Sequence, residues 1–472
     1  MPTDLILVSP HVDRLLQHRD WAPSKYLGIA YLAASAREAG LSVRVIDARG
    51  ERLTREEVVN RICEWSPRVV GFTAMTHEVN RAADLADGVR SRGCTATLVV
   101  GGAHATALPE QCLEDFAAFD VAVKGEAERT IVEVFHALDD GGGLDGVQGL
   151  AWRRPEITFT GERPVIEDLD VLPRPAWDLF PFTPHFPVFS ARGCPYQCNF
   201  CMRALGSRYR FRSSLNVVEE LEELVDTYGA RSVSFEDETF VIRRDRADEL
   251  LDLVIERGLN LRLQWLANLH AKSLDPELAR KMVAAGCISV GTGVESGNPD
   301  ILARAGKGLT VDLAADSARI LKDAGLQVRA FFIFGHPGET PAAAWDTVRL
   351  AARINPDQAS FGIMVPYPST EIARMVERGE GGYRVLSLDW SSYDKYLGGA
   401  LELEMFPRYM LEIFQVVAYL WLYLSNGRFF DLMKFMRRHA RAGWILLWRI
   451  MFSHSPVRSA RTAGIPRPVR SS

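Results

Sequence analysis

Cysteine is scarce in this chain, and no apolar run is long enough to cross a membrane. Only 7 of the 472 residues are cysteine, a density that does not fit a disulfide-stabilised secreted protein. No stretch approaches about eighteen uninterrupted apolar residues, so we expect no spanning helix. Basic residues are not in excess, because 55 Lys and Arg face 60 Asp and Glu, which argues against a nucleic-acid partner. The N-terminus lacks the basic region and cleavage site of a secretory signal, so we expect a cytoplasmic protein.

Three of the seven cysteines lie close together. Cys194, Cys198 and Cys201 are separated by three and then two residues, so one short loop can direct three thiolates to one point. Three thiolates are one fewer than usually hold a [4Fe–4S] cluster, which leaves one iron open to a small molecule. A tetrahedral zinc site would need a fourth ligand, and the next histidine downstream is His270. A disulfide would leave one of the three cysteines unpaired.

The spacing of these cysteines, with Phe200 directly before the last one, resembles the radical S-adenosylmethionine (SAM) superfamily. The resemblance implies that the three thiolates hold a [4Fe–4S] cluster whose open iron binds the amino and carboxylate groups of SAM. It also implies that an external electron donor such as flavodoxin or ferredoxin supplies the electron that cleaves SAM to a 5′-deoxyadenosyl radical. The other four cysteines are scattered, and we expect them to be small buried hydrophobes.

Residues 1–140 alternate short apolar runs with helical patterns, which predicts parallel strands joined by helices. The expected strands are 5–9, 42–47, 69–73, 96–100 and 121–124. They predict an α/β domain with a doubly wound, Rossmann-like sheet, whose ligand crevice lies at the carboxyl ends of the strands. Small and polar residues that follow those ends are the candidate ligand contacts: Thr73, Gly101, Gly102, His104, Gly125 and Glu126.

The runs Gly101-Gly102-Ala103-His104-Ala105-Thr106 and Gly125-Glu126-Ala127-Glu128 resemble the cobalamin (B12)-binding domain that precedes many radical SAM domains. The resemblance implies that the candidate contacts hold cobalamin. The chain lacks the Asp-x-His-x-x-Gly motif that supplies a lower axial histidine in many cobalamin proteins, and the sequence after His11 does not match it. We therefore expect base-off cobalamin without a protein histidine below cobalt. His104 is a candidate ligand, with a hydrogen bond that fixes the turn as the alternative.

Four further regions follow the first domain. Residues 141–187, with three consecutive glycines and a proline-broken run, are expected to be a linker. Residues 188–375 contain six expected strands, at 188–191, 232–236, 262–267, 288–292, 328–333 and 360–364. Six strands suit the partial (β/α)6 radical SAM barrel that the resemblance implies, with chemistry at the carboxyl ends. Residues 376–454 are expected to form helices, at 410–424 and 429–452, and residues 455–472 a disordered tail.

The C-terminal helices combine aromatic and leucine side chains with several basic ones. We expect them to cap the mouth of the barrel and shape the substrate pocket. A basic amphipathic helix can also lie on an anionic membrane surface, which we consider the less favoured alternative.

Two segments after barrel strands carry candidate SAM contacts in addition to Phe200. Asp237 and Glu238 follow the second strand, where the alternative is a solvated acidic turn or a helix cap. Gly293, Glu295 and Ser296 follow the fourth strand, in a Gly-x-Glu-Ser pattern that recurs in this class. The carboxylates could accept hydrogen bonds from the methionine amine or the ribose hydroxyls of SAM. Asn268, His270 and the turn 334–340 are further candidates, with a structural role as the alternative.

These features predict a cobalamin-dependent radical SAM enzyme that methylates an unactivated carbon of a small-molecule substrate. In the family logic, one SAM methylates cobalamin and another provides the radical that abstracts a substrate hydrogen. Two alternatives stay open. The substrate radical could instead undergo dehydration, cyclisation or rearrangement without cobalamin. The chain could also be a cobalamin- or redox-sensing binding protein with no enzymatic activity.

Overall fold

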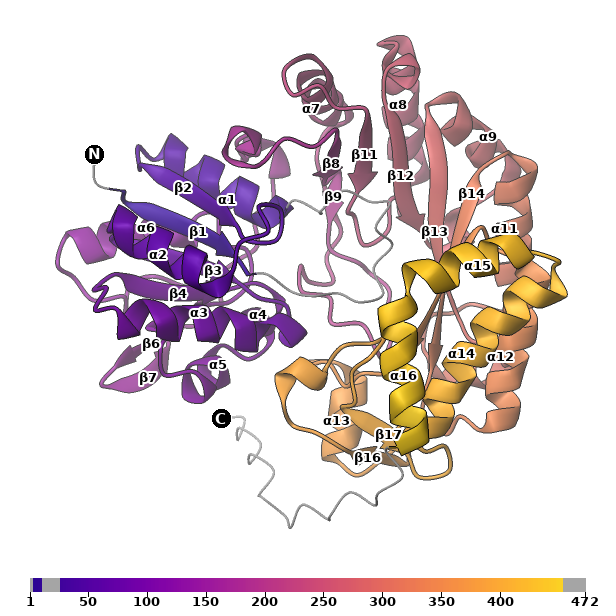
Figure 1. The fold of residues 1–472 in the computed structure, drawn as a ribbon. Helices are drawn as coiled ribbons and strands as arrows, with labels where there is room; N and C mark the ends of the chain where they lie inside the picture. Colours follow the sequence, from indigo (N-terminus) through magenta and orange to yellow (C-terminus); the bar gives the residue numbers. More distant parts are fainter. Residues whose placement is uncertain (1–2, 11–25, 453–472) are drawn as a thin grey trace.

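The computed structural model describes residues 3–10 and 26–452, with side chains as far as Leu446. It contains two largely parallel β-sheets flanked by helices and a helical C-terminal region (Figure 1). Within the described residues no helix is long and apolar enough to span a membrane. The expected tail 455–472 and the His11 segment lie outside the described residues.

The first sheet has the strand order β2-β1-β3-β4-β5-β6-β7. Its parallel strands are β1 (Leu5–Ser9), β2 (Val43–Asp47), β3 (Val69–Thr73), β4 (Thr97–Gly101) and β5 (Val121–Val123). The connecting helices are α1 (Leu27–Glu38), α2 (Arg55–Trp65), α3 (Val79–Ser91), α4 (Ala103–Ala107), α5 (Pro109–Asp115) and, after β5, α6 (Thr130–Asp139). The order 2-1-3-4-5 is that of a flavodoxin-like doubly wound sheet. The expected fold is confirmed.

Helices cover both faces of this sheet because successive strand residues point to opposite sides. Leu5 and Leu7 pack in the core cluster that includes α1 and α6. Ile6 and Val8 pack in the cluster that includes α2, α3 and α5. The sheet is therefore buried on both faces, and its strand ends remain as the place where a ligand can approach.

The expected linker 141–187 proves to be partly structured. Its strands β6 (Leu150–Arg154) and β7 (Glu156–Phe159) form a hairpin that joins the edge of β5 in antiparallel register. The first sheet therefore extends past the expected boundary at residue 140. The hairpin carried no clear signal because Arg153, Arg154 and Glu156 are exposed, which leaves too short an alternating pattern to mark a strand.

The second sheet contains six parallel strands in chain order, β8-β11-β12-β13-β14-β15. They are β8 (His185–Val188), β11 (Ser232–Phe235), β12 (Gln264–Leu269), β13 (Cys287–Glu295), β14 (Gln327–Phe334) and β15 (Gln358–Ile363). The helices between them are α7 (Ser214–Asp226), α8 (Arg244–Glu256), α9 (Pro276–Ala284), α10 (Pro299–Arg304), α11 (Val311–Asp323) and α12 (Pro341–Ile354). The expected six-stranded partial barrel is confirmed, as the curved array in Figure 1 shows.

The C-terminal region consists of α13 (Glu371–Glu377), the hairpin of β16 (Tyr383–Val385) and β17 (Leu401–Leu403), and three helices. These are α14 (Arg408–Ser425), α15 (Phe429–Arg438) and α16 (Ala440–Phe452), so the expected helix 429–452 is broken at His439. Helix α14 lies beside α12 and packs on β15. The Phe361 ring on β15 contacts Tyr419 of α14. Phe361 also belongs to the hydrophobic core that the barrel strands share with their helices. The expected cap on the barrel mouth is therefore wrong for α14, which covers the outer face of the last strand.

Candidate functional site

The cysteine motif lies in a loop that a short ladder closes at its base. Strand β9 (Ala191–Arg192) pairs antiparallel with β10 (Arg210–Phe211), so residues 193–209 form the loop between them. Gly193 has φ +85°, and a Cβ there would lie 2.1 Å from the Arg208 carbonyl oxygen. Only glycine fits this first loop position. The expected first barrel strand 188–191 therefore ends earlier, at Val188, because residues 191–192 leave the sheet to form the ladder.

Two acidic side chains, the buried Asp237 and the partly buried Glu238, hold the chain where it enters this loop. The Asp237 carboxylate accepts hydrogen bonds from the Ser190 N–H (2.7 Å) and the Ala191 N–H (3.1 Å). Burial raises the pKa of Asp237 to about 6, against the lowering effect of these hydrogen bonds. The neighbouring Glu238 accepts from the Gly193 N–H at 3.2 Å. Both residues expected at SAM thus support the backbone of the cysteine loop, and Asp237 is fully committed to it.

The three motif cysteines are free and partly exposed. Burial raises the pKa of the Cys198 thiol to about 11, opposed by the Lys307 ammonium and reinforced by the neighbouring Cys201 and Cys194. Such thiols release their protons on binding iron. Across the described part of the chain, no group of three or more His, Cys, Asp or Glu side chains is arranged to hold a metal ion. The donor set itself fits a cluster, because one short loop carries three free thiols.

Contacts from the barrel and from the C-terminal region hold the middle of the loop. The Asn199 N–H donates to the Ala305 carbonyl at 3.1 Å, and its carbonyl accepts from the Ile372 N–H at 3.1 Å. Phe200 packs against the cluster of Met364, Ile372 and Leu401. The motif aromatic, expected at SAM, is thus a packing residue that anchors the loop.

His270 does not provide the fourth ligand that a zinc site would need. Its ring stacks on Tyr196 of the cysteine loop with a centroid distance of 3.9 Å. Nδ1 accepts from the Lys272 N–H at 3.2 Å, and Nε2 donates to the Lys307 carbonyl at 3.1 Å. Burial lowers the pKa of His270 to about 4, so the ring is neutral at pH 7 and both nitrogens are engaged. The zinc alternative therefore loses its candidate ligand.

The Gly-x-Glu-Ser pattern is built around a buried ion pair. The Lys307 ammonium lies 2.5 Å from the Glu295 carboxylate and donates to the Gly293 carbonyl at 2.7 Å. A Cβ on Gly293 would lie 2.1 Å from both charged groups, so glycine makes room for the pair. Glu295 has φ +65°, an unusual conformation for a residue other than glycine and one that often marks functional sites. Lys307 was missed because a single lysine in a glycine turn carries no motif.

The other candidates in the barrel have structural partners. The buried Ser296 hydroxyl bonds to the Thr347 hydroxyl at 3.1 Å and accepts from the Asn298 N–H. Asn268 accepts from Arg329 at 3.3 Å. In the turn 334–340, the buried Glu339 carboxylate accepts from the Gly335 and His336 N–H groups. These residues shape the strand ends, and Ser296 in particular has its hydroxyl occupied.

A cavity opens at the carboxyl ends of the first sheet, with about 930 Å³ of empty space when the solvent at its mouth is included. Five predicted cobalamin contacts line it: Thr73, Gly101, Gly102, Gly125 and Glu126. A Cβ on Gly28, Gly101 or Gly125 would meet no atom within 4 Å, so these glycines leave open wall. Leu205 and Ala204 of the cysteine loop form part of the opposite wall. Glycine backbone and aliphatic side chains at this crevice fit the close approach of a bulky group such as cobalamin.

His104 is absent from the residues that line this cavity. Its imidazole is fully buried, edge-on to Trp390 at 4.8 Å, and neither ring nitrogen has a hydrogen-bond partner in the described structure. The turn is fixed by the His104 backbone N–H, which donates to the Ala74 carbonyl at 3.2 Å. The imidazole is therefore a packing group away from the cavity lining, and the hydrogen bond that fixes the turn comes from the backbone. Trp390 comes from the C-terminal region, which no local pattern could have indicated.

The Gly125-Glu126-Ala127-Glu128 run forms a clasp to the base of the cysteine loop. Glu126 pairs with Arg192 of β9 and Arg210 of β10, both at 2.8 Å, and Glu128 pairs with Arg192 at 2.6 Å. All four side chains are at most 7% exposed. Glu126, predicted as a cobalamin contact, thus lines the cavity with its carboxylate held by two arginines. We call these four residues the arginine clasp.

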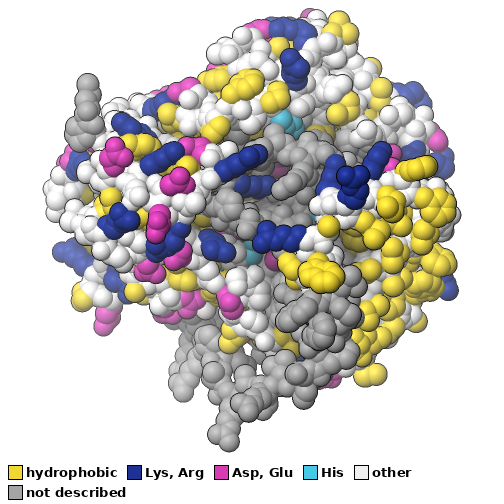
Figure 2. All heavy atoms as spheres, viewed as in Figure 1, with side chains coloured by type: hydrophobic (Ala, Val, Ile, Leu, Met, Phe, Trp, Pro, Cys, Tyr) yellow, Lys and Arg dark blue, Asp and Glu magenta, His cyan; other side chains and the backbone are white. Residues whose placement is uncertain are grey.

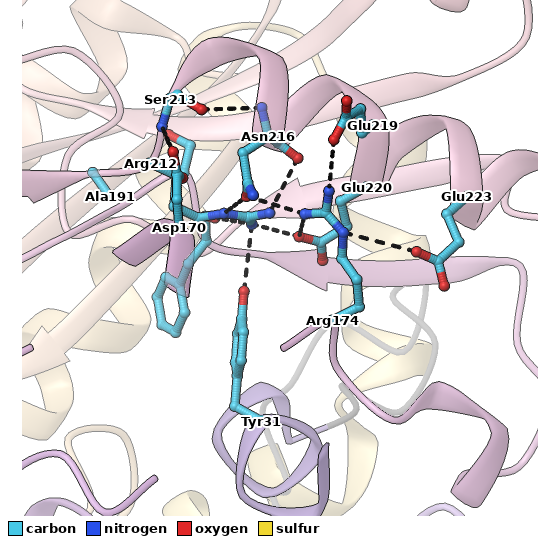
Figure 3. A network of polar contacts seen from close by, with 12 residues as sticks. Tyr31, Asp170, Arg174, Ala191, Arg212, Ser213, Asn216, Glu219, Glu220 and Glu223 are labelled. Atoms are coloured by element: carbon cyan, nitrogen blue, oxygen red, sulfur yellow. Dashed lines mark hydrogen bonds and ion pairs between the residues drawn. The ribbon is translucent and has the colours of Figure 1, made fainter. Parts of the chain in front are cut away.

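A second polar network joins the two sheets, as Figure 3 shows. Arg212, directly after β10, donates to the Tyr31 hydroxyl of α1 at 3.4 Å and pairs with Glu220 of α7. Asn216 accepts from Arg212 at 2.7 Å and from Arg174 at 3.0 Å. The cavity and the cysteine loop are therefore held together by two sets of contacts between segments far apart in sequence.

Comparison with known proteins agrees with this arrangement. The family model of the B12 binding domain matches residues 24–135, and that of the radical SAM superfamily matches residues 188–351. An uncharacterized methyltransferase of Pyrococcus horikoshii is 32% identical over 399 residues, which cover 82% of this chain and 86% of that protein. The anaerobic magnesium-protoporphyrin IX monomethyl ester cyclase of Rubrivivax gelatinosus is 28% identical over 79% of this chain and 69% of its own length.

Solved structures share the fold. The radical SAM methyltransferase TsrM of Kitasatospora setae, with cobalamin and a [4Fe–4S] cluster bound, superposes with a TM-score of 0.70 at 19% identity, covering 90% of this chain and 89% of that one. The cobalamin-dependent radical enzyme OxsB gives a TM-score of 0.72 at 17% identity, covering 88% of this chain and 66% of that one. Superfamily membership makes the chain an enzyme, against the alternative of a sensor without activity. The chain therefore belongs to the radical SAM enzymes that carry an N-terminal B12-binding domain, with SAM, a [4Fe–4S] cluster and cobalamin as cofactors.

Proposed function

We propose that this enzyme transfers a methyl group to an unactivated carbon of a small-molecule substrate, with the three motif cysteines as cluster ligands. The observation that carries the proposal is the shared wall between the two candidate sites. Ala204 and Leu205 of the cysteine loop line the same cavity as Gly101 and Gly125 of the first sheet. A cofactor in that cavity lies against the cysteine loop, as a methyl donor and a radical source acting on one substrate must.

When bound, cobalamin supplies a methyl carrier and the cluster supplies one electron to SAM. The protein's own residues do the positioning. Glu295, paired with Lys307, presents a carboxylate oxygen at the end of β13 close to Cys198. Gly101 and Gly125 have no side chain and would leave room for cobalamin against the cavity wall. We propose that an external flavodoxin or ferredoxin delivers the electron and that the enzyme works in the reducing cytoplasm.

The curated relatives support methyl transfer by name. The relative at 32% identity is a methyltransferase, and the cytidylyl-2-hydroxyethylphosphonate methyltransferase of Streptomyces wedmorensis is 27% identical over 74% of this chain and 77% of its own length. A second candidate, radical cyclisation without methyl transfer, is favoured by the cyclase relatives, one of which is 30% identical over 75% of this chain. The two candidates differ in what becomes of the methyl group of SAM.

The deciding experiment uses anaerobically reconstituted enzyme, SAM with a deuterated methyl group and a chemical reductant, read by mass spectrometry. With cobalamin loaded and no substrate added, we expect S-adenosylhomocysteine to form in a cobalamin-dependent burst of about one equivalent. A triple alanine variant of the motif cysteines should lose 5′-deoxyadenosine, since the reductive cleavage of SAM needs the cluster. Formation of 5′-deoxyadenosine alone, with or without cobalamin, would reject methyl transfer in favour of cyclisation.

A further inference from the structure

Large apolar side chains gather on the outer surface of α14, α15 and α16. Phe430 is 85% exposed and Trp444 is 70% exposed, although residues of these types are normally buried. The other members are 44–59% exposed: Trp421, Leu424, Phe429, Met433 and Met436. Figure 2 shows a broad field of hydrophobic side chains on this side of the molecule, with Lys and Arg side chains next to it. We call these seven residues the apolar face.

Helix α15 divides into three sectors around its axis. Leu432 and His439 are buried against the protein, and Phe435 stacks on Tyr419 of α14 with a centroid distance of 4.4 Å. Phe429, Met433 and Met436 recur at the spacing of one helix face and point away from that core. Lys434, Arg437 and Arg438 occupy the third sector, beside the apolar one. A helix whose only role was to cover the protein core would need apolar side chains in the first sector alone.

Much of the positive charge beside the apolar face has no acidic partner among the described residues. Five basic residues lie between 426 and 446, whereas Asp431 is the only acidic residue there and pairs with Arg428 at 2.9 Å. Lys434, Arg437 and Arg441 make no ion pair with any described residue. Arg378, by comparison, pairs with both Glu371 and Glu380 on the surface. This local excess stands out in a chain of net charge −5.

We propose that the apolar face docks on an anionic lipid surface. Aromatic and methionine side chains can enter the boundary between headgroups and acyl chains, while flanking basic side chains contact lipid phosphates. Such a face would be costly to leave in water, and large exposed apolar patches usually mark interaction sites. The charge of the flanking residues selects an anionic lipid over an uncharged protein surface. The contact is peripheral, because no helix in the described ranges can span a bilayer.

The test is flotation of the full-length holoenzyme with vesicles of phosphatidylcholine, with or without about one third phosphatidylglycerol. We expect binding to the anionic vesicles that falls steeply with added salt. Replacing Lys434, Arg437 and Arg441 by serine should weaken binding on the order of a hundred-fold, since each basic residue contributes roughly five-fold. The pair Phe430→Ser and Met433→Ser should weaken it to a similar extent.

Matched controls come from exposed residues elsewhere on the surface. Leu261 is 86% exposed, so Leu261→Ser removes an equally exposed apolar side chain and should leave binding unchanged. Arg319→Ser removes an exposed basic side chain and should also leave binding unchanged. Unchanged circular dichroism would show that the variants fold. The proposal is overturned if neither vesicle binds the enzyme, or if the apolar-face variants instead convert an oligomer to a monomer in light scattering, which would assign the face to self-association.

Discussion

The arginine clasp provides the sharpest quantitative test of how the two domains depend on each other. Glu126→Ala removes one carboxylate and leaves the Arg192 and Arg210 guanidiniums, 4% and 2% exposed, with their charge partly unpaired. Arg192 keeps Glu128, and Arg210 keeps the Ile166 carbonyl. Removing one partner of a buried ion pair costs about 3–5 kcal/mol. We expect a loss of unfolding free energy in this range.

The matched control is a surface pair on the same strand end. Lys124 pairs with Glu162, whose side chain is 69% exposed. Exposed pairs contribute about 0–1 kcal/mol because water and salt screen them. For a cooperative unit of roughly 150–250 residues, the buried change corresponds to a fall in Tm of about 6–20 °C and the control to less than about 4 °C. Because a two-domain protein need not unfold in one step, the first thermal transition is the relevant one.

The pH dependence gives the clasp an independent signature. Burial alone would raise the pKa of Glu126, but the hydrogen bonds and charges of Arg210 and Arg192 outweigh it and hold the pKa below the usual 4.5. A lowered carboxyl pKa stabilises the fold above the unfolded pKa, and this stability is lost as the pH falls through the folded pKa. The Tm difference between the wild type and Glu126→Gln should therefore shrink below about pH 4.5.

The assay combines differential scanning calorimetry, trypsin digestion and a cobalamin titration on each variant. Loosening the clasp should make the cysteine loop, with Arg203 and the already exposed Arg208, more susceptible to trypsin, whereas Glu162→Ala should not. The reasoning would be refuted if Glu126→Gln abolished cobalamin binding while its Tm stayed within the range of the control. That outcome would return Glu126 to the role of a direct cobalamin contact.

Three further predictions concern the cofactor sites and one buried acid. Alanine in place of all three motif cysteines should reduce the iron content of the reconstituted protein from about four per chain to none, while Cys287→Ala, buried in β13, keeps it; retained iron would contradict the assignment. Gly101→Val places a side chain in open space and should lower cobalamin affinity at least about ten-fold without changing Tm. The exposed control Gly146→Val should leave the affinity unchanged, and equal cobalamin affinities of the two variants would place cobalamin elsewhere. Burial raises the pKa of Glu339 to about 8, so its folded form holds a proton that the unfolded chain releases above 4.5. The wild type should then lose on the order of 4–5 kcal/mol between pH 4.5 and 8, and Glu339→Gln should remove that slope.

Changing Gly102 would not test the cavity as cleanly as changing Gly101. Gly102 has φ +98°, and a Cβ there would lie 2.8 Å from the Ala74 carbonyl oxygen. A side chain at this position strains the turn itself, so lost cobalamin binding would report misfolding. The neighbouring Gly101 ends β4 with ordinary backbone angles, and its backbone lines the cavity without a side chain.

Local pattern alone determined a large part of this protein. The five parallel strands of the first sheet, β1 to β5, lie within one residue of their expected bounds because they are short runs of buried apolar residues bounded by turns. The cysteine spacing alone pointed to the cluster and the family. The start of α12 is likewise determined by adjacent residues, since the Thr340 hydroxyl caps the helix and Pro341 follows it in the first turn.

Only the tertiary structure decided what the charged residues do. Glu126 and Glu128 meet Arg192 and Arg210 across more than sixty residues of chain, and Trp390 buries His104 from the far C-terminal region. Asp237 and Glu238 stand at a strand end, as expected, but turn toward the backbone of the cysteine loop. The periodicity of adjacent residues predicts a strand or a helix. An ion pair between distant segments has no such periodicity, because it depends on which carboxylate the folded backbone brings to which guanidinium.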